Sequence, residues 1–333
     1  MPTVSLGQVS ATVFEKVVGK KPEDNIFTSQ ALLYLLKRNG GFRALDGGRL
    51  IEETLEYAEN TTFRSYSDLE TLDTTRVDVF DCARFDWKEV GGTIVISNLE
   101  KKRAQGRSAK INLVTSKANN AKNSMMAVLN RMFYTDGTGN SSKDIGGLKL
   151  LIPYDPTTGT VGGINRATFT FWRSRTQAGT QGASAFDNLR AKMRTIYNQC
   201  SKGAADEQPE WFIFDSTSFA GYESTLVSNE RFTKQDKSGK VDGGFRNDML
   251  QFKGADCTFD EDVPLGLVNA ATTGTCYVGN SRNLKFNYPE GGWAETFAPV
   301  EPANQTAEIV RIATVGNMSI NNPRRVGVIG GIT

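Results

Sequence analysis

INLVTSKANNAKNSMMAVLNRMFY, residues 111–134, is the stretch from which the fold of this chain is best read. Its small and apolar residues recur at steps of three and four, which predicts an apolar helix face opposite a polar one. These residues are Ile111, Val114, Ala118, Ala121, Met125, Val128, Leu129, Met132 and Phe133. The motif DGTG at 136–139 predicts the end of the helix. A helix about 36 Å long is either the core helix of a soluble domain or a structural spine across a plate-like subunit.

The composition indicates a folded protein of mixed class. The chain has 333 residues, of which 38% are hydrophobic and 23% charged, which is enough for two or three modules or one elaborated domain. Thirty-three glycines favour many turns and extended segments, so we expect an α+β protein rather than a helical bundle. The net charge is only +2, so the chain as a whole has no strong positive electrostatic field that would attract nucleic acid.

The chain contains no histidine, which removes the commonest general base and metal ligand. Its four cysteines are widely dispersed and form no C-x-x-C pair, so we expect free thiols rather than a zinc or redox site. The N-terminus lacks the apolar core of a signal peptide, and no apolar run approaches the roughly 20 residues of a membrane helix. We therefore expect a soluble cytoplasmic product.

Before the spine helix, residues 1–27 show little periodicity, and the segment QALLYLLKR at 30–38 predicts a short helix capped by Thr28 or Ser29. Its leucine cluster is too apolar to lie exposed. Because the first 40 residues carry no further core, a neighbouring subunit is a candidate for the surface that covers it.

Between residues 47 and 99 the pattern changes to period two, which predicts a β-hairpin. A thirteen-residue strand from Arg76 to Lys88 would pair with Leu50–Ala58 across a polar tip at 60–75, and a further strand is expected at 93–97. The hairpin either belongs to an ordinary sheet or projects as an arm that pairs with another molecule.

Charge is sharply divided between the hairpin and the helix. Residues 46–89 contain twelve acidic and five basic residues, whereas residues 101–135 contain eight basic residues and no acidic one. We expect the acidic hairpin of one subunit to dock on the basic helix region of the next, although a short basic run such as 101–103 is also typical of a solvated face. The candidate contact residues are Glu52, Glu53, Glu56, Lys101, Lys102, Arg103, Lys117, Lys122 and Arg131.

The second half of the chain alternates predicted helices and strands. Helices are expected at 184–200 and 216–226, and the apolar run WFIF at 211–214 predicts a buried strand. Further extended segments are expected at 250–252, 275–278, 284–288, 306–316 and 324–332. The last of these must return to a sheet begun much earlier, so the domain around the spine helix is predicted to be discontinuous.

No motif predicts a catalytic, cofactor or metal site. The motif DGTGN at 136–140 resembles the opening of a calcium loop but lacks the glycine and glutamate that should follow. The acidic cluster Asp256, Asp260, Glu261 and Asp262 lies in a segment bounded by Pro and Gly, so we expect solvated charges there. No phosphate-binding glycine motif or nucleophile elbow occurs.

Several motifs occur in a particular order along the chain. They are Asp136-Gly-Thr-Gly, Gly146-Gly-Leu-Lys, Gly162-Gly-Ile-Asn-Arg with Trp172-Arg173, and the ending Asn317…Asn322-Pro-Arg-Arg-Val-Gly-Val-Ile-Gly-Gly-Ile. In this order, with the arm, hairpin, spine helix and returning strands, they resemble the major capsid protein family of tailed bacteriophages, which has the Hong Kong ninety-seven type fold. The resemblance covers nearly the whole chain from about residue 28.

The resemblance implies a division of the chain into five segments. Residues 1–46 would form an N-terminal arm with a short helix, and 47–99 an extended hairpin loop. A peripheral domain would comprise 100–204, with the spine helix, and the closing strands 280–333. Residues 205–279 would form an axial domain near capsomer centres.

The family implies a structural protein rather than an enzyme. It would assemble into hexamers and pentamers that close an icosahedral head around double-stranded DNA, with a portal protein and a decoration protein as partners and no membrane. The virion would be its location, after assembly in the host cytoplasm. The short arm implies a separate scaffolding protein, and the absence of lysine between Leu50 and Trp87 gives no support for covalent cross-linking.

Two alternatives stay open. The same fold also serves as the shell of encapsulin-like cellular nanocompartments. A different class of protein, an enzyme centred on Asp260 and Glu261, would use the acidic cluster for acid–base chemistry.

Overall fold

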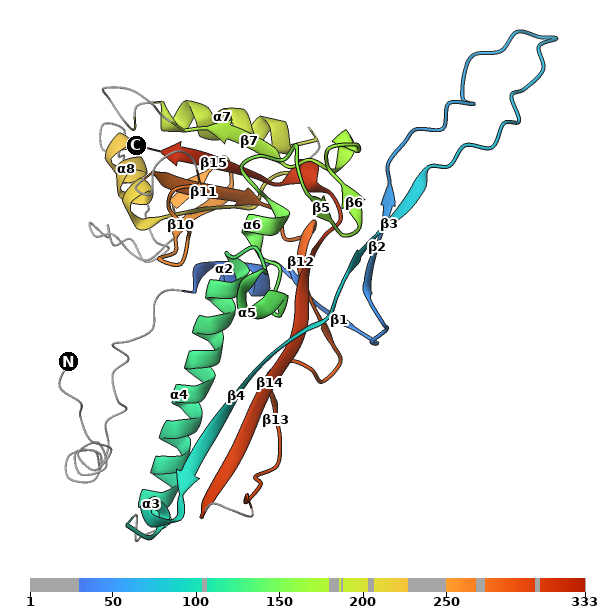
Figure 1. Cartoon of the computed structure of the whole chain (residues 1–333). Coiled ribbons are helices and arrows are strands. Elements are labelled where there is room, and N and C mark those ends of the chain that lie inside the picture. The colour runs from blue at the N-terminus through green and yellow to red at the C-terminus, as the bar shows by residue number, and fades with distance from the viewer. Residues whose placement is uncertain are drawn as a thin grey trace, which may run out of the picture. The chain divides into compact units, whose positions relative to one another are not determined.

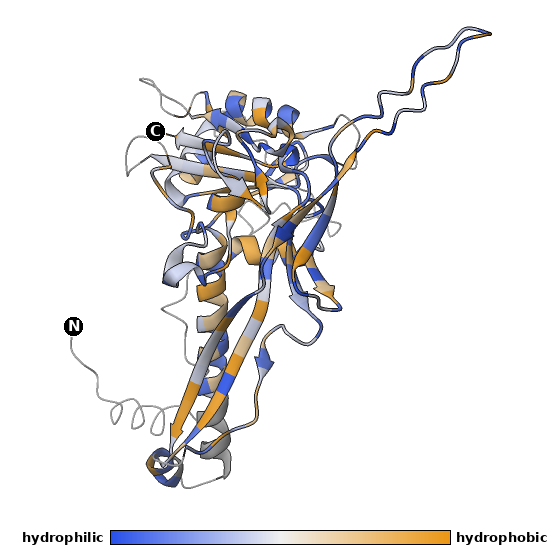
Figure 2. Ribbon diagram, turned by 45° about the vertical axis from the view of Figure 1, so that its right-hand side comes forward, coloured by the Kyte–Doolittle hydropathy of each residue, from blue (hydrophilic) through white to orange (hydrophobic). Residues whose placement is uncertain are grey.

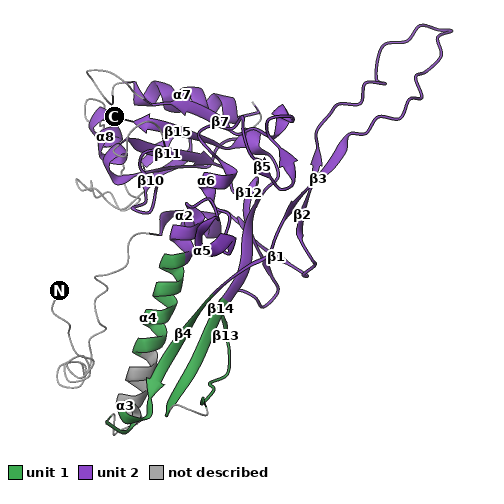
Figure 3. Ribbon diagram, in the orientation of Figure 1, with its two compact units in different colours: residues 1–28, 91–128, 294–313 green, residues 29–90, 129–293, 314–333 purple. Residues whose placement is uncertain are grey.

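The structure is a computed structural model that describes residues 30–103, 107–179, 186, 188–202, 207–226, 250–267, 273–302 and 306–332. The described chain divides into two compact units (Figure 3). Unit 1 contains residues 91–128 and 294–313, and unit 2 contains the other described residues. Residues 1–29 of the predicted N-terminal arm, with the predicted cap at Thr28 or Ser29, lie outside the described residues. The division into axial and peripheral domains stays a prediction.

Unit 1 is built on the first part of the spine helix and on strands from two distant segments. Helix α4 extends over Arg107–Phe133, which confirms the helix predicted at 111–134, although the side chains of Ile111 and Val114 lie outside the description. It follows β4 (Lys88–Ser97) and α3 (Asn98–Arg103). Strand β14 (Ala307–Ile320) pairs with β4 and, in antiparallel register, with β13 (Glu295–Thr296).

Unit 2 contains a six-stranded sheet with the order β7-β15-β11-β8-β10-β9. Figure 1 labels four of its strands, β7, β15, β11 and β10. Its strands are β7 (Arg175–Ala178), β8 (Trp211–Phe214), β9 (Leu250–Phe252), β10 (Ala255–Phe259), β11 (Gly274–Gly279) and β15 (Gly327–Ile332). Strand β15 inserts between β7 and β11, parallel to the first and antiparallel to the second. This placement confirms that the last strand returns to a sheet begun much earlier.

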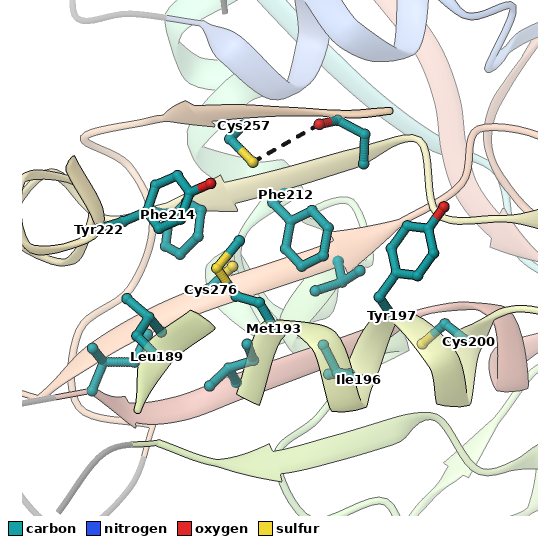
Figure 4. Close-up of a cluster of buried hydrophobic side chains, with 14 residues drawn as sticks. Leu189, Met193, Ile196, Tyr197, Cys200, Phe212, Phe214, Tyr222, Cys257 and Cys276 are labelled. Atoms are coloured by element: carbon teal, nitrogen blue, oxygen red, sulfur yellow. Dashed lines mark hydrogen bonds between the residues drawn. The ribbon is translucent and has the colours of Figure 1, made fainter. Parts of the chain in front are cut away.

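Helices α7 (Leu189–Cys200) and α8 (Ser216–Leu226) pack on the six-stranded sheet and enclose its core with it (Figure 4). The helix predicted at 184–200 therefore begins at Leu189, and the residues 184, 185 and 187 lie outside the described part. The buried side chains are aliphatic, aromatic and thiol groups: Leu189, Met193, Ile196, Tyr197, Cys200, Phe212, Phe214, Tyr222, Ala255, Cys257, Cys276, Val278, Ile329 and Ile332.

Helix α2 (Ala31–Arg38) buries its leucines within its own chain. Leu32, Leu35 and Leu36 are fully buried, and the helix packs against β8 in unit 2. The expectation that this cluster needs a neighbouring subunit was wrong, because the surface that covers it is formed by residues more than 150 positions further along the chain.

The hairpin is confirmed, but its strands are short. Strand β2 (Ile51–Glu56) pairs antiparallel with β3 (Phe80–Phe85), with Ile51 opposite Phe85. The predicted thirteen-residue strand is wrong: β3 has six residues, and the chain from 60 to 79 continues as two irregular limbs (Figure 1). In these limbs, side chains form local hydrogen bonds with the backbone that compete with hydrogen bonds between the two strands. For example, Asp73 Oδ1 accepts the Thr75 amide at 3.0 Å.

Unit 2 contains further strands and short helices outside the six-stranded sheet. Strand β1 (Phe42–Leu45) pairs parallel with β12 (Leu284–Pro289), which pairs antiparallel with residues 317–320 of β14. Two short strands, β5 (Thr160–Val161) and β6 (Ile164–Asn165), form a small hairpin. The short helices are α5 (Gly139–Ser142), α6 (Leu148–Leu151), η1 (Thr170–Trp172) and η4 (Pro323–Arg325).

None of the helices in the described ranges combines the length and apolar character needed to cross a bilayer.

The backbone of the motif GGL at 146–148 packs closely against the end of α4. A Cβ atom on Gly147 would lie 2.4 Å from the Phe133 carbonyl oxygen and 2.5 Å from that of Met132. Both contacts are with helix backbone, which cannot move aside without breaking α4. Only glycine fits at this position.

We expect Gly147→Ala to lower the free energy of unfolding by at least about 2 kcal/mol, because the added methyl group overpacks a site lined by backbone. Urea unfolding of the isolated subunit measures the change. Gly92→Ala is the matched control, since its Cβ would meet nothing within 4 Å, and it should change stability by no more than about 0.5 kcal/mol. Equal stabilities of the two variants would contradict the packing argument.

Candidate functional site

The acidic cluster after β10 is not a solvated loop. Asp260 is completely buried, and its Oδ2 atom accepts the backbone amides of Ala31 at 2.9 Å and Leu32 at 3.5 Å. The carboxylate thus occupies the N-terminal end of α2, where unsatisfied amides and the helix dipole both favour a negative charge. The expectation of solvated charge was wrong for Asp260, because its partners lie about 230 residues away in the sequence.

The same carboxylate also binds the C-terminal turns of α4. Asn130 Nδ2 donates to Asp260 Oδ2 at 3.0 Å and to Asp262 Oδ2 at 2.8 Å. The Tyr134 hydroxyl donates to Asp260 at 3.1 Å. One buried aspartate therefore joins the start of α2, the end of α4 and the loop after β10.

Burial raises the pKa of Asp260 above its ordinary value, while the hydrogen bonds from Asn130 and Tyr134 oppose that shift. Burial, followed by the nearby Asp260 charge, raises the pKa of Tyr134 well above its ordinary value. A group sealed from solvent cannot reach a substrate, whereas Glu261 is exposed. Asp260 and Glu261 therefore do not form a shared acid–base site.

A second residue of the cluster holds the other end of α2. Asp256 forms an ion pair with Arg38 in the last turn of the helix and also accepts a bond from Gln251 Nε2 at 3.2 Å. Asp256 is mostly buried. Two aspartates, one within β10 and one directly after it, thus clamp α2 at both ends.

The described residues offer neither a metal centre nor a reactive thiol. No group of three or more acidic or cysteine side chains is arranged to hold a metal ion within the described ranges. All four cysteines are free, as expected. Burial raises the pKa of the Cys200 and Cys257 thiols to about 12, which keeps them protonated and unreactive at neutral pH.

The predicted acidic contact residues separate into two groups on β2. Glu52 and Glu56 are exposed, whereas Glu53 is buried and forms an ion pair with Arg43. Glu53 also accepts the Ser319 hydroxyl at 2.8 Å. Because its carboxylate is already paired inside unit 2, Glu53 is no longer a candidate for a contact between subunits.

The predicted basic contact residues also differ in their surroundings. Lys117 Nζ donates to Glu100 at 2.6 Å and to the Val95 carbonyl at 3.1 Å, so its charge is used within unit 1. The other described members, Lys102, Arg103, Lys122 and Arg131, are exposed. The side chain of Lys101 lies outside the description.

The base of the hairpin is fixed by contacts that periodicity did not reveal. The Tyr57 and Phe171 rings stack with centroids 5.5 Å apart, and the Arg84 amide donates to the Gly162 carbonyl at 2.9 Å. Asn317 Nδ2 donates to the Asp86 carbonyl at 2.8 Å. Gly162 and Asn317 belong to the quoted motifs, so these motifs orient the hairpin.

The fold of this chain is similar to that of solved capsid proteins. No protein family model matches the chain, and no curated protein matches it. The solved capsid of cyanophage A-1(L) is similar over 97% of this chain and 99% of its own, with a TM-score of 0.62 and 15% sequence identity. The capsid of a native GTA particle matches over the same shares, with a TM-score of 0.61 and 11% identity.

A cellular shell protein has the same architecture. In the holo-SrpI encapsulin complex from Synechococcus elongatus PCC 7942, the likeness covers 99% of this chain and 96% of that chain, with a TM-score of 0.57 and 10% identity. The chain thus has the α+β fold of the Hong Kong ninety-seven type capsid proteins, as its motifs indicated.

We expect Asp260→Ala to lower the free energy of unfolding by about 3 kcal/mol, because it leaves buried donors of α2 and α4 without a partner. Urea unfolding of the isolated subunit measures the loss. Glu261→Ala removes a neighbouring exposed carboxylate and should change stability by less than about 0.5 kcal/mol. A similar loss in both variants would show that Asp260 does not have this structural role.

The hydrogen bonds of Asp136, in the turn after α4, predict that the stability of the fold depends on pH. Bonds from the Thr138 hydroxyl and amide, with help from Lys149, lower the pKa of Asp136 from 3.8 to about 2. The ionised carboxylate therefore stabilises the fold above about pH 4, and this contribution is lost as the pH falls toward 2. Asp136→Asn should melt below the wild type at pH 7, and the difference should vanish near pH 2. Thermal unfolding at several pH values tests this, and a difference independent of pH would contradict it.

Proposed function

We propose that this chain is the major capsid protein of a tailed bacteriophage and that it self-assembles into hexamers and pentamers of an icosahedral head around double-stranded DNA. The observation that carries the proposal is the likeness to solved capsids over 97% of the chain, without a large unmatched segment on either side. The role is structural, and no catalytic group is needed for it.

Assembly of such a shell rests on repeated contacts between identical copies. Each copy buries parts of its surface on its neighbours, and modest contacts add up over a closed lattice. The exposed acidic face of β2, with Glu52 and Glu56, supports a role for the hairpin in these contacts. A charged contact of this kind sets register and partner choice more than affinity.

The partners of the proposed protein follow from the same role. They are further copies of itself, a separate scaffolding protein, a portal protein, a decoration protein and packaged DNA held by non-specific contacts. Its location would be the virion, after assembly in the host cytoplasm.

A second candidate is the shell of a cellular nanocompartment that encloses a protein cargo. The likeness to the SrpI encapsulin, which covers 99% of this chain, favours it. Its TM-score of 0.57 lies within the range of the solved phage capsids, 0.52 to 0.62, so we place the phage head first on the order of the sequence motifs instead.

Electron microscopy of the purified protein tests the proposal. We expect closed shells of uniform size, formed with or without a co-expressed scaffolding protein. Shells that contain DNA after infection support the phage head, and shells that contain a single enzyme support the nanocompartment. A discrete monomer or dimer under all assembly conditions would contradict both.

A further inference from the structure

The C-terminal end of α2 contains the one Asn-Gly pair in the sequence, Asn39-Gly40. Asn39 ends the helix with φ −93° and ψ 12°, and it is half-buried. Gly40 is exposed and has a φ of +73°, a left-handed conformation that glycine adopts at little cost. The pair therefore joins a carboxamide to a residue that has no side chain to shield its amide nitrogen.

The hydrogen bonds at this helix end are incomplete. The Gly41 amide donates to the Leu36 carbonyl at 2.7 Å, which is one of the two bonds of a Schellman motif. The other bond, from the Gly40 amide to the Lys37 carbonyl, is absent among the described residues, and the Asn39 side chain has no partner there either. The Gly40 amide and the Asn39 carboxamide are therefore both free of bonds within this part of the chain.

The backbone at Gly40 has room to rotate. A Cβ atom on Gly40 would meet nothing within 4 Å, whereas one on Gly41 would lie 2.9 Å from Leu36 Cδ2. Bringing the Gly40 nitrogen to Asn39 Cγ requires rotation about the Asn39 Cα–C bond, away from the observed ψ of 12°. Helix ends open locally far more often than a whole domain unfolds, so the last turn of α2 can supply this rotation.

An ion pair limits the opening of this turn. Arg38, the last residue of α2, pairs with Asp256 of β10, and Asp256 is mostly buried. Asp256 also accepts a bond from Gln251 Nε2 at 3.2 Å. The residue next to Asn39 is thus tied to the six-stranded sheet, so the last turn of α2 opens less often than an untied helix end.

We propose that Asn39 is a site of spontaneous deamidation, in which the Gly40 amide nitrogen is the nucleophile and the Arg38–Asp256 ion pair controls the rate. The reaction needs no enzyme, and it does not depend on the proposed shell function. Its substrate is the chain itself, and its co-reactant is water.

The reaction proceeds in two steps. Hydroxide takes the proton of the Gly40 amide, and the nitrogen attacks Asn39 Cγ. The Cγ–Nδ2 bond breaks, Nδ2 takes a proton from water and leaves as ammonia, and a five-membered imide remains. Water then adds to one imide carbonyl and breaks its bond to the Gly40 nitrogen, which regains a proton. Opening at Cγ gives aspartate, and opening at the main-chain carbon gives isoaspartate, with no change in oxidation state.

Either product changes the end of α2. Aspartate places a negative charge at the negative end of the helix dipole, next to Arg38, where it competes with Asp256. Isoaspartate adds a methylene group to the main chain before Gly40, which disrupts the bond from Gly41 to Leu36. Deamidated protein should therefore melt at a lower temperature than freshly purified protein.

Peptide mapping by mass spectrometry tests the proposal. Folded protein kept in mildly alkaline buffer should gain the mass of amide-to-acid conversion at Asn39, as separate aspartate and isoaspartate peptides. The internal comparison is Asn123, which is exposed on α4 and is followed by Ser124. Figure 2 shows hydrophilic residues interspersed with hydrophobic ones along this helix. Asn39 should react at least about tenfold faster than Asn123, since the amide of Ser124 is held within the helix.

A pair of variants tests the role of the ion pair. Asp256→Asn removes the charge that binds Arg38 and should speed the reaction at Asn39 at least about threefold. Glu261→Gln neutralises an exposed carboxylate in the same segment and should leave the rate unchanged. The acceleration should be confined to Asn39, because a general loss of stability would also speed the reaction at Asn123.

Further variants test the chemistry. Asn39→Gln should abolish the mass gain, because its longer side chain cannot close a five-membered ring. Gly40→Ala should slow the reaction, since the added methyl group shields the nitrogen. Thermal unfolding shows whether each variant folds, and Arg38→Gln breaks the same ion pair if Asp256→Asn does not fold.

Three outcomes would overturn the proposal. Equal rates at Asn39 and Asn123 would show that the helix end is not a reactive site. Aspartate as the sole product would indicate direct hydrolysis of the carboxamide, without attack by Gly40. No acceleration at Asn39 in either ion-pair variant would show that the Arg38–Asp256 pair does not control the rate.

Discussion

The buried carboxylate of Asp260 is the interaction on which the arrangement of unit 2 depends. A single side chain satisfies the first amides of α2, the amide group of Asn130 and the hydroxyl of Tyr134. Leaving a buried charge unpaired costs several kcal/mol, so these three partners must be in place together. Asp260 therefore fixes the N-terminal end of α2 to the end of the spine helix, while Asp256 holds the other end of α2.

Backbone connectivity reinforces this constraint. Strand β15 completes the sheet between β7 and β11, and β10, which carries Asp256, lies two strands from β11. The order of strands thus brings the end of the chain and its middle into one core, and α2 packs against β8 of the same sheet. The hairpin base forms hydrogen bonds with Gly162 and Asn317 of the same unit, so these contacts with unit 2 fix the direction of the hairpin.

Sequence reasoning recovered what local periodicity encodes. The spine helix and the strand WFIF appear where the pattern predicts them, since the first has one clear period and the second is one apolar run, and the helix expected at 216–226 is α8. The length of β3 was overestimated because alternation alone does not show where a partner strand ends. Asp260 and Glu53 were read as surface acids, and only residues far along the chain make them internal.

The clamp on α2 has a consequence for sequence divergence. Asp260 binds the amides of Ala31 and Leu32, which every amino acid except proline provides, and the Arg84 amide at the hairpin base is equally indifferent to side-chain identity. The part of each junction that relies on main-chain groups therefore tolerates substitution, whereas Asp260, Asn130 and Asn317 contribute their side chains. A fold joined partly by main-chain groups can persist while much of the sequence changes, and solved shells that share 10–15% of their residues with this chain have a similar fold.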